Sequence, residues 1–270
     1  MNVQEIIALI EDSAPLTGAA TWDRSGVQIA GQKNDVRKLA ALLDPVPDGI
    51  AEALAWGADM ILTHHPLYME PRALDAPGDF LDVARMVLAH GSWLYAAHTS
   101  LDAQPEGPAG WLARSFKLSH VRVLEPTGAP GENVGLGIIG DLPDPIAWPR
   151  FAASLAECVE RDFWTTSGEP PASIRTMAYC TGSGGSLVEA AKSAKADVYV
   201  TGDLKYHQAL CAGIFLVDVG HFSLEEEMIR LFAKDLDSGL SPKGVAVKFF
   251  KGADPFTVHL SSKGPAPQRP

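Results

Sequence analysis

Cysteine is scarce in this 270-residue sequence, and its three cysteines, Cys158, Cys180 and Cys211, lie far apart. No Cys-x-x-Cys pair occurs anywhere in the chain. We therefore expect neither a disulfide framework nor a closed zinc site of the cysteine-rich kind. All three thiols are expected to be reduced.

The sequence also lacks an apolar run long enough to span a membrane, and its first residues lack the basic segment of a secretory signal. We therefore expect a cytoplasmic protein with no membrane partner. Basic side chains are in the minority, with 22 Lys and Arg against 33 Asp and Glu, so the formal net charge is −11. This charge argues against nucleic acid as a partner, because the phosphate backbone is attracted by a surplus of basic side chains.

Apolar residues, by contrast, are frequent, and their spacing indicates both helices and strands. Apolar residues recur with a helical period between Val3 and Glu11 and between Ser223 and Asp235, whereas short continuous runs such as Met60–Leu62 indicate buried strands. Strands and helices alternate along most of the chain, which predicts an α/β fold with helices on the sheet faces.

The sequence suggests two lobes. Proline and glycine are frequent between about residues 124 and 170, and we take this segment as part of a second, smaller α/β lobe over 124–204. Residues 1–123 and 205–260 are assigned to a main α/β lobe. The polar, proline-rich residues 261–270 are expected to be a disordered tail.

Histidines and carboxylates follow four of the predicted strands. The strands and the polar residues at their ends are Met60–Leu62 with His64 and His65, Trp93–Ala97 with His98 and Asp102, Asp197–Val200 with Asp203, and Ile214–Val219 with His221 and Glu225. In open α/β sheets, ligands bind in the crevice beyond the carboxyl ends of the strands. We therefore expect these side chains to converge on one pocket.

The donor set suits divalent metal ions. Four imidazoles and two carboxylates are too many for one ion and about right for two ions bridged by a carboxylate. Mixed imidazole and carboxylate ligands favour Zn, Fe or Mn over Mg or Ca. Taken singly, each residue also fits a simpler role, since His98 and Asp102 could form a buried hydrogen-bonded pair and the helix dipole favours Glu225 in a first turn.

Two further features have open interpretations. The Gly182–Ser186 loop follows a predicted strand and could cradle a phosphate with its backbone N–H groups, or it could be a tight turn. His207 lies just beyond Asp203 and could transfer protons, or it could be an exposed helix residue.

Five stretches of the chain together resemble one family, the GTP cyclohydrolase 1 type 2 homologues, also called Nif-three-like dinuclear metal proteins. The stretches occur in the family's order and are Trp22–Gln28, Ala58–Leu67, Ala97–Asp102, Ala196–His207 and Asp218–Glu225. The chain departs from the family pattern at Arg24 and Ser25, where the family more often has Asn and a small apolar residue.

The resemblance implies a two-lobed α/β fold with mixed sheets flanked by helices and a metal site between the lobes at strand C-terminal ends. It implies two divalent ions per subunit, and it implies a ring-shaped homohexamer. His98 matches a position beside the ions. The implied ligands are His64, His65, Asp102, His221 and Glu225.

These features lead to a functional hypothesis. We expect a divalent-metal-dependent hydrolase that acts on GTP or another nucleotide or phosphoester, with Asp102 or Glu225 bridging the ions and His98 or His207 passing protons. The alternative is a non-catalytic metal-binding, metal-trafficking or interaction protein, because a family label alone does not establish chemistry.

Overall fold

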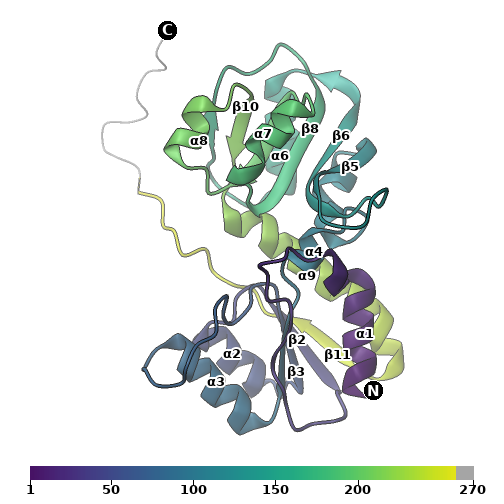
Figure 1. Ribbon diagram of the computed structural model, residues 1–270, viewed down its shortest axis with the longest axis vertical. Coiled ribbons are helices and arrows are strands. Elements are labelled where there is room, and N and C mark those ends of the chain that lie inside the picture. The colour runs from purple at the N-terminus through teal and green to yellow at the C-terminus, as the bar shows by residue number, and fades with distance from the viewer. Residues whose placement is uncertain (260–270) are drawn as a thin grey trace.

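The apolar runs of the sequence form strands of two separate sheets, and each sheet is the centre of one lobe (Figure 1). The computed structural model describes residues 1–259. Both sheets are mixed and both are flanked by helices, which confirms the predicted α/β class. None of the described helices is long and apolar enough to cross a membrane.

The first sheet has five strands in the order β1-β4-β3-β2-β11. Its strands are β1 (Gly26–Ile29), β2 (Lys38–Leu42), β3 (Met60–Thr63), β4 (Trp93–Ala96) and β11 (Ala246–Phe249). The pairs β4/β3, β3/β2 and β2/β11 are parallel, and only β1 runs antiparallel to its neighbour. The carboxyl ends of four strands therefore lie at the same edge of this sheet.

The second sheet has six strands in the order β5-β6-β8-β9-β10-β7. Its strands are β5 (Ser119–Pro126), β6 (Gly135–Ile146), β7 (Thr165–Ser167), β8 (Ile174–Ser183), β9 (Val198–Gly202) and β10 (Phe215–Asp218). The neighbours β8, β9 and β10 are parallel. The other pairs are antiparallel.

Helices cover both faces of each sheet. The α-helices are α1 (Val3–Ser13), α2 (Pro47–Ala55), α3 (Asp79–His90), α4 (Thr99–Asp102), α5 (Trp111–Ser115), α6 (Trp148–Cys158), α7 (Val188–Ser193), α8 (Tyr206–Cys211) and α9 (His221–Leu240). Four short 3₁₀ turns complete the described elements, at Leu16–Gly18, Pro108–Gly110, Gly185–Leu187 and Ser241–Lys243.

Strand β2 shows how one apolar run serves two faces. Successive side chains of a strand point to opposite sides of the sheet. Leu39 and Ala41 therefore join the core formed with α1 and α9, whereas Ala40 and Leu42 pack with α2 and α3. All four side chains are buried, which explains why the run is continuously apolar rather than alternating.

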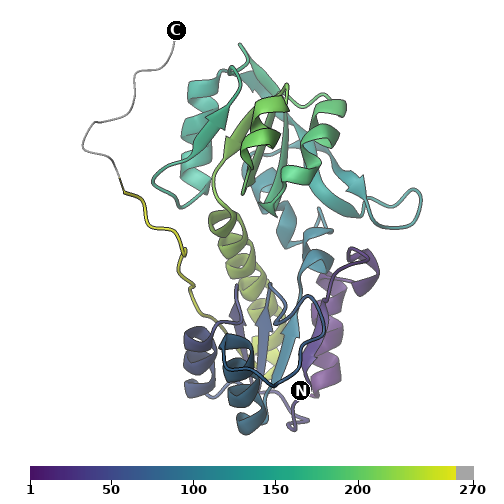
Figure 2. The same cartoon turned by 60° about the vertical axis from the view of Figure 1, so that its left-hand side comes forward.

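Helix α9 joins the two lobes. It contacts β8 and β9 of the second sheet and β2 and β11 of the first, and Figure 2 shows it running from one lobe into the other. Half of its residues are buried, and these include Glu225 in its second turn. A glutamate buried in this helix therefore lies where the lobes meet.

Strand pairing moves the predicted lobe boundaries. The second sheet begins with β5 at Ser119 rather than at residue 124, and it extends through β10 at Asp218, beyond the predicted end at 204. With six strands against five, its sheet is not the smaller one. Alternation of strands and helices does not reveal which sheet a strand joins, because that depends on its pairing partner. The predicted tail, 261–270, lies outside the described residues.

Candidate metal centre

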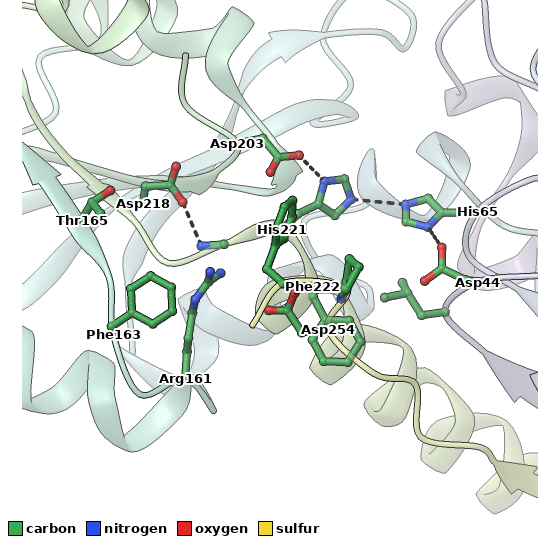
Figure 3. A pocket seen from close by; sticks show the side chains of 14 residues that line it. Asp44, His65, Arg161, Phe163, Thr165, Asp203, Asp218, His221, Phe222 and Asp254 are labelled. Atoms are coloured by element: carbon green, nitrogen blue, oxygen red, sulfur yellow. Dashed lines mark hydrogen bonds and ion pairs between the residues drawn. The ribbon is translucent and has the colours of Figure 1, made fainter. Parts of the chain in front are cut away.

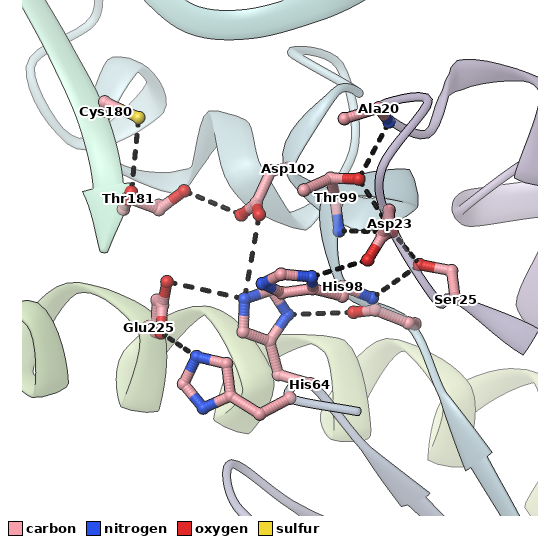
Figure 4. Close-up of polar contacts among 12 residues, drawn as sticks. Ala20, Asp23, Ser25, His64, His98, Thr99, Asp102, Cys180, Thr181 and Glu225 are labelled. Carbon is pink, nitrogen blue, oxygen red and sulfur yellow. Dashed lines mark hydrogen bonds and ion pairs between the residues drawn. The ribbon is translucent and has the colours of Figure 1, made fainter. Parts of the chain in front are cut away.

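The polar residues at the four strand ends meet at the junction of the lobes. Figure 4 shows His64, His98, Asp102 and Glu225 among them. His64 and His65 directly follow β3, and His98 lies between β4 and α4. His221 is the first residue of α9, so Glu225 lies one helical turn later on the same face. The convergence predicted from the sequence is therefore present in the described part of the chain.

Each of the four imidazoles is oriented by a hydrogen bond at Nδ1. The pairs are His64 Nδ1 with Ala97 O at 2.8 Å, His65 Nδ1 with Asp44 Oδ1 at 2.7 Å, His98 Nδ1 with Asp23 Oδ1 at 2.7 Å, and His221 Nδ1 with Asp203 Oδ2 at 2.8 Å. Carbonyl and carboxylate oxygens only accept, so each Nδ1 donates. Such partners at one ring nitrogen are typical of histidines that bind a metal through the other.

The Nε2 atoms and carboxylates form three groups of possible ligands, and the ligand atoms within each group lie within 4.8 Å of one another. The groups are His65, His221 and Glu225; His64, Asp102 and Glu225; and His64, His65 and His98. Glu225 belongs to two groups through different oxygens. Its Oε1 is 3.4 Å from His64 Nε2, and its Oε2 is 2.7 Å from His221 Nε2. Glu225 is therefore the carboxylate that two groups share, whereas Asp102 belongs to one group only.

Two features of the chain fit a pair of divalent cations. Nε2 of His64 is buried and has no hydrogen-bond partner among the described residues, although carboxylates of Glu225 and Asp102 lie 3.4 and 3.7 Å away. Nε2 of His65 and Nε2 of His221 are only 3.3 Å apart. Both of these nitrogens face each other and the same oxygen, Glu225 Oε2, at 3.1 and 2.7 Å. A cation bound among these nitrogens and carboxylates would give His64 Nε2 a partner and would separate the charges of His65 and His221.

The two groups that contain Glu225 differ in their exposure to solvent. His64 is fully buried and Glu225 is 3% exposed. His65 and His221, in contrast, line a pocket of about 430 Å³ between the lobes (Figure 3). The His64–Asp102–Glu225 group is thus largely closed by protein, with only the Asp102 side chain partly exposed, at 12%, whereas the His65–His221–Glu225 group opens on a cavity.

The Gly182–Ser186 loop, which begins within the last two residues of β8, closes the centre on the side of the second lobe. Gly182 has a φ of +61°, and a Cβ there would collide with Glu225 Oε1. The N–H of Gly184 already donates to Thr201 Oγ1 at 2.9 Å. The tight-turn interpretation of this loop therefore agrees with its contacts, and its glycine leaves room for the Glu225 carboxylate.

We expect Gly182→Ala to lower both the metal content and the thermal midpoint. The added methyl group displaces the Glu225 carboxylate, and the positive φ costs a non-glycine residue about 1–2 kcal/mol. Gly244→Ala is the matched control, because Gly244 has a φ of +80° and a Cβ there would meet no atom within 4 Å. Elemental analysis of both variants should show metal loss in the first alone; equal metal contents would contradict the proposed role of this loop.

The pKa values of the two carboxylates in the cluster, Asp102 and Glu225, are shifted in opposite directions. Burial raises the pKa of Asp102. Burial alone would also raise the pKa of Glu225, but the surrounding imidazoles of His64, His221 and His65 hold it well below its usual range. Glu225 is therefore the carboxylate that stays ionised among the histidines.

The two histidines of the open group, His65 and His221, have raised pKa values. Burial alone would lower the pKa of His65, but hydrogen bonds with Asp44 and Glu225 raise it to about 10. The pKa of His221 is raised to about 9 by Glu225 and Asp203 against the same effect of burial. In the chain alone, both imidazoles are therefore protonated at neutral pH.

We expect ion uptake at about pH 7.5 to release protons, because an ion must displace them from Nε2 of His65 and His221. The raised pKa values stabilise the ion-free fold fully below pH 6.5, and this contribution is lost as the pH rises through about 9 and 10. Affinity for the ion should therefore fall with falling pH. Calorimetric titrations in buffers of different ionisation enthalpy count the released protons, and finding none would contradict histidine ligation.

Sequence reasoning placed Asp203 at the centre without its role in orienting a histidine, and it missed Asp44 and Thr181. Asp23, Asp44 and Asp203 orient histidines, and Thr181 Oγ1 donates to Asp102 Oδ1 at 2.7 Å. Burial alone would raise the pKa of Asp23, but hydrogen bonds from His98, Ser25 and Thr99 hold it far below its usual range. Asp44 could have been noticed, since it directly follows the apolar run Leu39–Leu43, as other residues of the centre follow theirs.

The structure does not bring His207 to the centre. It lies exposed on α8, beside the ring of Tyr206, and belongs neither to the three ligand groups nor to the lining of the pocket. His98 is the better candidate for proton transfer, because its ring lies 5.2 Å from that of His64 and 5.6 Å from that of His65, centroid to centroid.

Known proteins resemble this chain over nearly its whole length. The profile of the family described as Duf34/NIF3 (NGG1p interacting factor 3) matches residues 1–255. The "GTP cyclohydrolase 1 type 2 homolog" of Streptomyces coelicolor is 30% identical over 272 residues, covering 97% of this chain and 95% of that protein. The protein of the same name from Lactococcus lactis is 30% identical over 253 residues, covering 88% and 92%.

Solved structures share the fold. Reduced HcgD from Methanocaldococcus jannaschii superposes with a TM-score of 0.79 at 28% identity, covering 92% of this chain and 96% of that one. A Bacillus cereus protein related to NIF3 gives a TM-score of 0.84 at 23% identity, covering 96% and 99%.

Proposed function

The chain belongs to the Duf34/NIF3 family, and from this premise we propose that it is a hydrolase that uses two divalent ions to cleave a small phosphoester. Nucleotides are the favoured substrates, and the name of the relatives includes GTP. The proposed ion ligands are His64, His65, Asp102, His221 and Glu225, with Zn, Fe or Mn as the metal.

The observation that carries this proposal is the difference in access between the two ligand groups. Catalytic metal sites keep one coordination position open, whereas structural sites are closed by protein. His65 and His221 border the pocket, and the buried His64 does not. The open group therefore has room for water and a substrate oxygen, while the closed group holds its ion and shares Glu225 with the open one.

The residues of the chain then have defined roles. Two divalent ions at this centre would supply Lewis-acid activation of water and of a phosphoryl oxygen. Asp44 and Asp203 hold the rings of His65 and His221 with Nε2 turned inward. Asp23 does the same for His98, which leaves His98 Nε2 free to pass protons.

The closed group also favours a second candidate function. A site surrounded by protein ligands suits metal storage or delivery, because exchange of the ion requires the lobes to open. On this alternative the pocket would serve a partner or carrier molecule rather than a substrate.

Assays of the full-length protein separate the two functions. The protein is loaded with Mn, Zn or Fe(II), freed of unbound ions, and tested against GTP and a panel of phosphomonoesters and phosphodiesters. We expect turnover of at least one phosphoester that is lost on chelation and recovered on reloading. No turnover with any of the three metals would overturn the hydrolase proposal and favour storage.

A further inference from the structure

The pocket beside the centre contains an arginine with no carboxylate partner among the described residues. Arg161 lines the same 430 Å³ cavity as His65 and His221 (Figure 3). The one hydrogen bond of its guanidinium within the described chain runs from Nη1 to Val219 O at 2.9 Å. The charge of this guanidinium is therefore not neutralised by any ion pair in residues 1–259.

The guanidinium is held in place beside the centre. It lies over the ring of Phe163, 4.5 Å from the ring centroid. It also packs against the backbone of Gly220, where a Cβ would collide with Nη1 and where φ is +82°. Gly220 directly precedes His221, so Arg161 packs against the chain segment that positions a proposed metal ligand.

Each of the four carboxylates of the pocket has a hydrogen-bond partner, and for Asp254 this is the N–H of Phe256 at 2.9 Å. Asp218 accepts hydrogen bonds from the N–H groups of Leu204 and Gly220, each at 2.9 Å. Asp44 and Asp203 are bonded to the imidazoles of His65 and His221. An anion that enters the pocket therefore finds one unpaired cation on the described part of the protein, at Arg161, in addition to the ions of the centre.

The remaining lining is largely apolar and includes three aromatic rings. Phe163, Phe222 and Phe256 border the same cavity. Aromatic side chains favour planar, apolar ligand groups, and an arginine favours phosphate through its fork of N–H donors. Pockets of ~300–1,000 Å³ are typical of small-molecule sites, so this cavity has a suitable size.

We propose that Arg161 and this aromatic pocket form the substrate subsite, which takes a nucleotide. The phosphate group lies between the Arg161 guanidinium and the open ion group, and the base lies against the phenylalanine rings. Arg161 thus determines specificity for the phosphorylated form of the ligand. This inference rests on the proposed function and names its substrate class.

Binding measurements test the subsite without requiring turnover. Guanosine 5′-monophosphate, guanosine and inorganic phosphate are each titrated into manganese-loaded full-length protein, and chromatography of the final mixture shows whether the nucleotide was cleaved. The variants are Arg161→Gln, Arg161→Lys and Phe163→Leu. Arg85→Gln is the control, because Arg85 lies on α3 with its side chain 67% exposed.

We expect Arg161→Gln to weaken binding of the monophosphate by ~10- to 100-fold, as removal of a charge-assisted hydrogen bond does, and to leave guanosine binding unchanged. Arg161→Lys should recover part of the loss, since lysine keeps the charge but not the fork. Phe163→Leu should weaken nucleotide and nucleoside alike. Metal content and thermal midpoint are measured for every variant. A variant that displaces His221 is then recognised by its loss of metal.

The outcomes separate this inference from the hydrolase proposal. Monophosphate binding by Arg161→Gln at wild-type strength, with full metal content, overturns the subsite, as does a wild-type protein that binds neither nucleotide nor nucleoside. Turnover with an unchanged KM in Arg161→Gln also overturns the subsite, while the hydrolase proposal stands. Arginine-dependent nucleotide binding without any turnover supports the subsite and overturns the hydrolase.

Discussion

Glu225→Gln is expected to reduce the bound metal from about two ions per chain to less than one. Glu225 presents Oε1 to His64 and Oε2 to His65 and His221, so one substitution removes the negative charge shared by both ligand groups. The effect should exceed the ~10- to 100-fold loss of affinity typical of changes to residues that only orient metal ligands. Elemental analysis and calorimetry measure it.

Glu227→Gln is the matched control on the same helix. Glu227 forms a surface ion pair with Arg230, with Nε to Oε2 at 2.6 Å, and exposed pairs of this kind contribute little to stability. This variant should bind metal like the wild type. If Glu225→Gln retained two tightly bound ions, the shared role of this carboxylate would be refuted.

His65→Ala and His64→Ala are expected to separate the two ions. Of the two groups that contain Glu225, only the open one loses a ligand in His65→Ala, so about one ion per chain should remain and phosphoester turnover should fall by ~100-fold or more. His64→Ala should also leave about one ion, now in the open group. It should lower the thermal midpoint further, because the buried carboxylates of Asp102 and Glu225 then lose the imidazole between them.

The two histidine variants are compared with a control variant, and the folding of each is checked. His120→Ala is the control, since His120 has a side chain that is 80% exposed and pairs only with Asp141 on the second lobe. Circular dichroism verifies that each variant is folded, and elemental analysis counts the ions. Complete metal loss in either histidine variant would mean that the ions bind only as a pair and would contradict two separable groups.

The proposed metal ligands could be found in the sequence because their signals are local. A short apolar run followed at once by His64 and His65 indicates the end of a buried strand, and His221 and Glu225 are spaced by one helical turn. The role of Asp23 could not be found this way, since Asp23 and His98 are 75 positions apart. Strand β10 was assigned to the wrong lobe for a similar reason. The sequence does not show that β10 pairs with β9 and β7.

The amino-acid sequence by itself determined the α/β class, the family and the set of histidines and carboxylates that follow the strands, because periodicity and strand ends are properties of neighbouring residues. The tertiary structure alone decided that Glu225 faces both ligand groups, that one group is closed and the other open, and that Arg161 reaches the pocket. These features depend on how two sheets and the joining helix α9 are placed against each other, and contacts between distant segments have no local pattern in the chain.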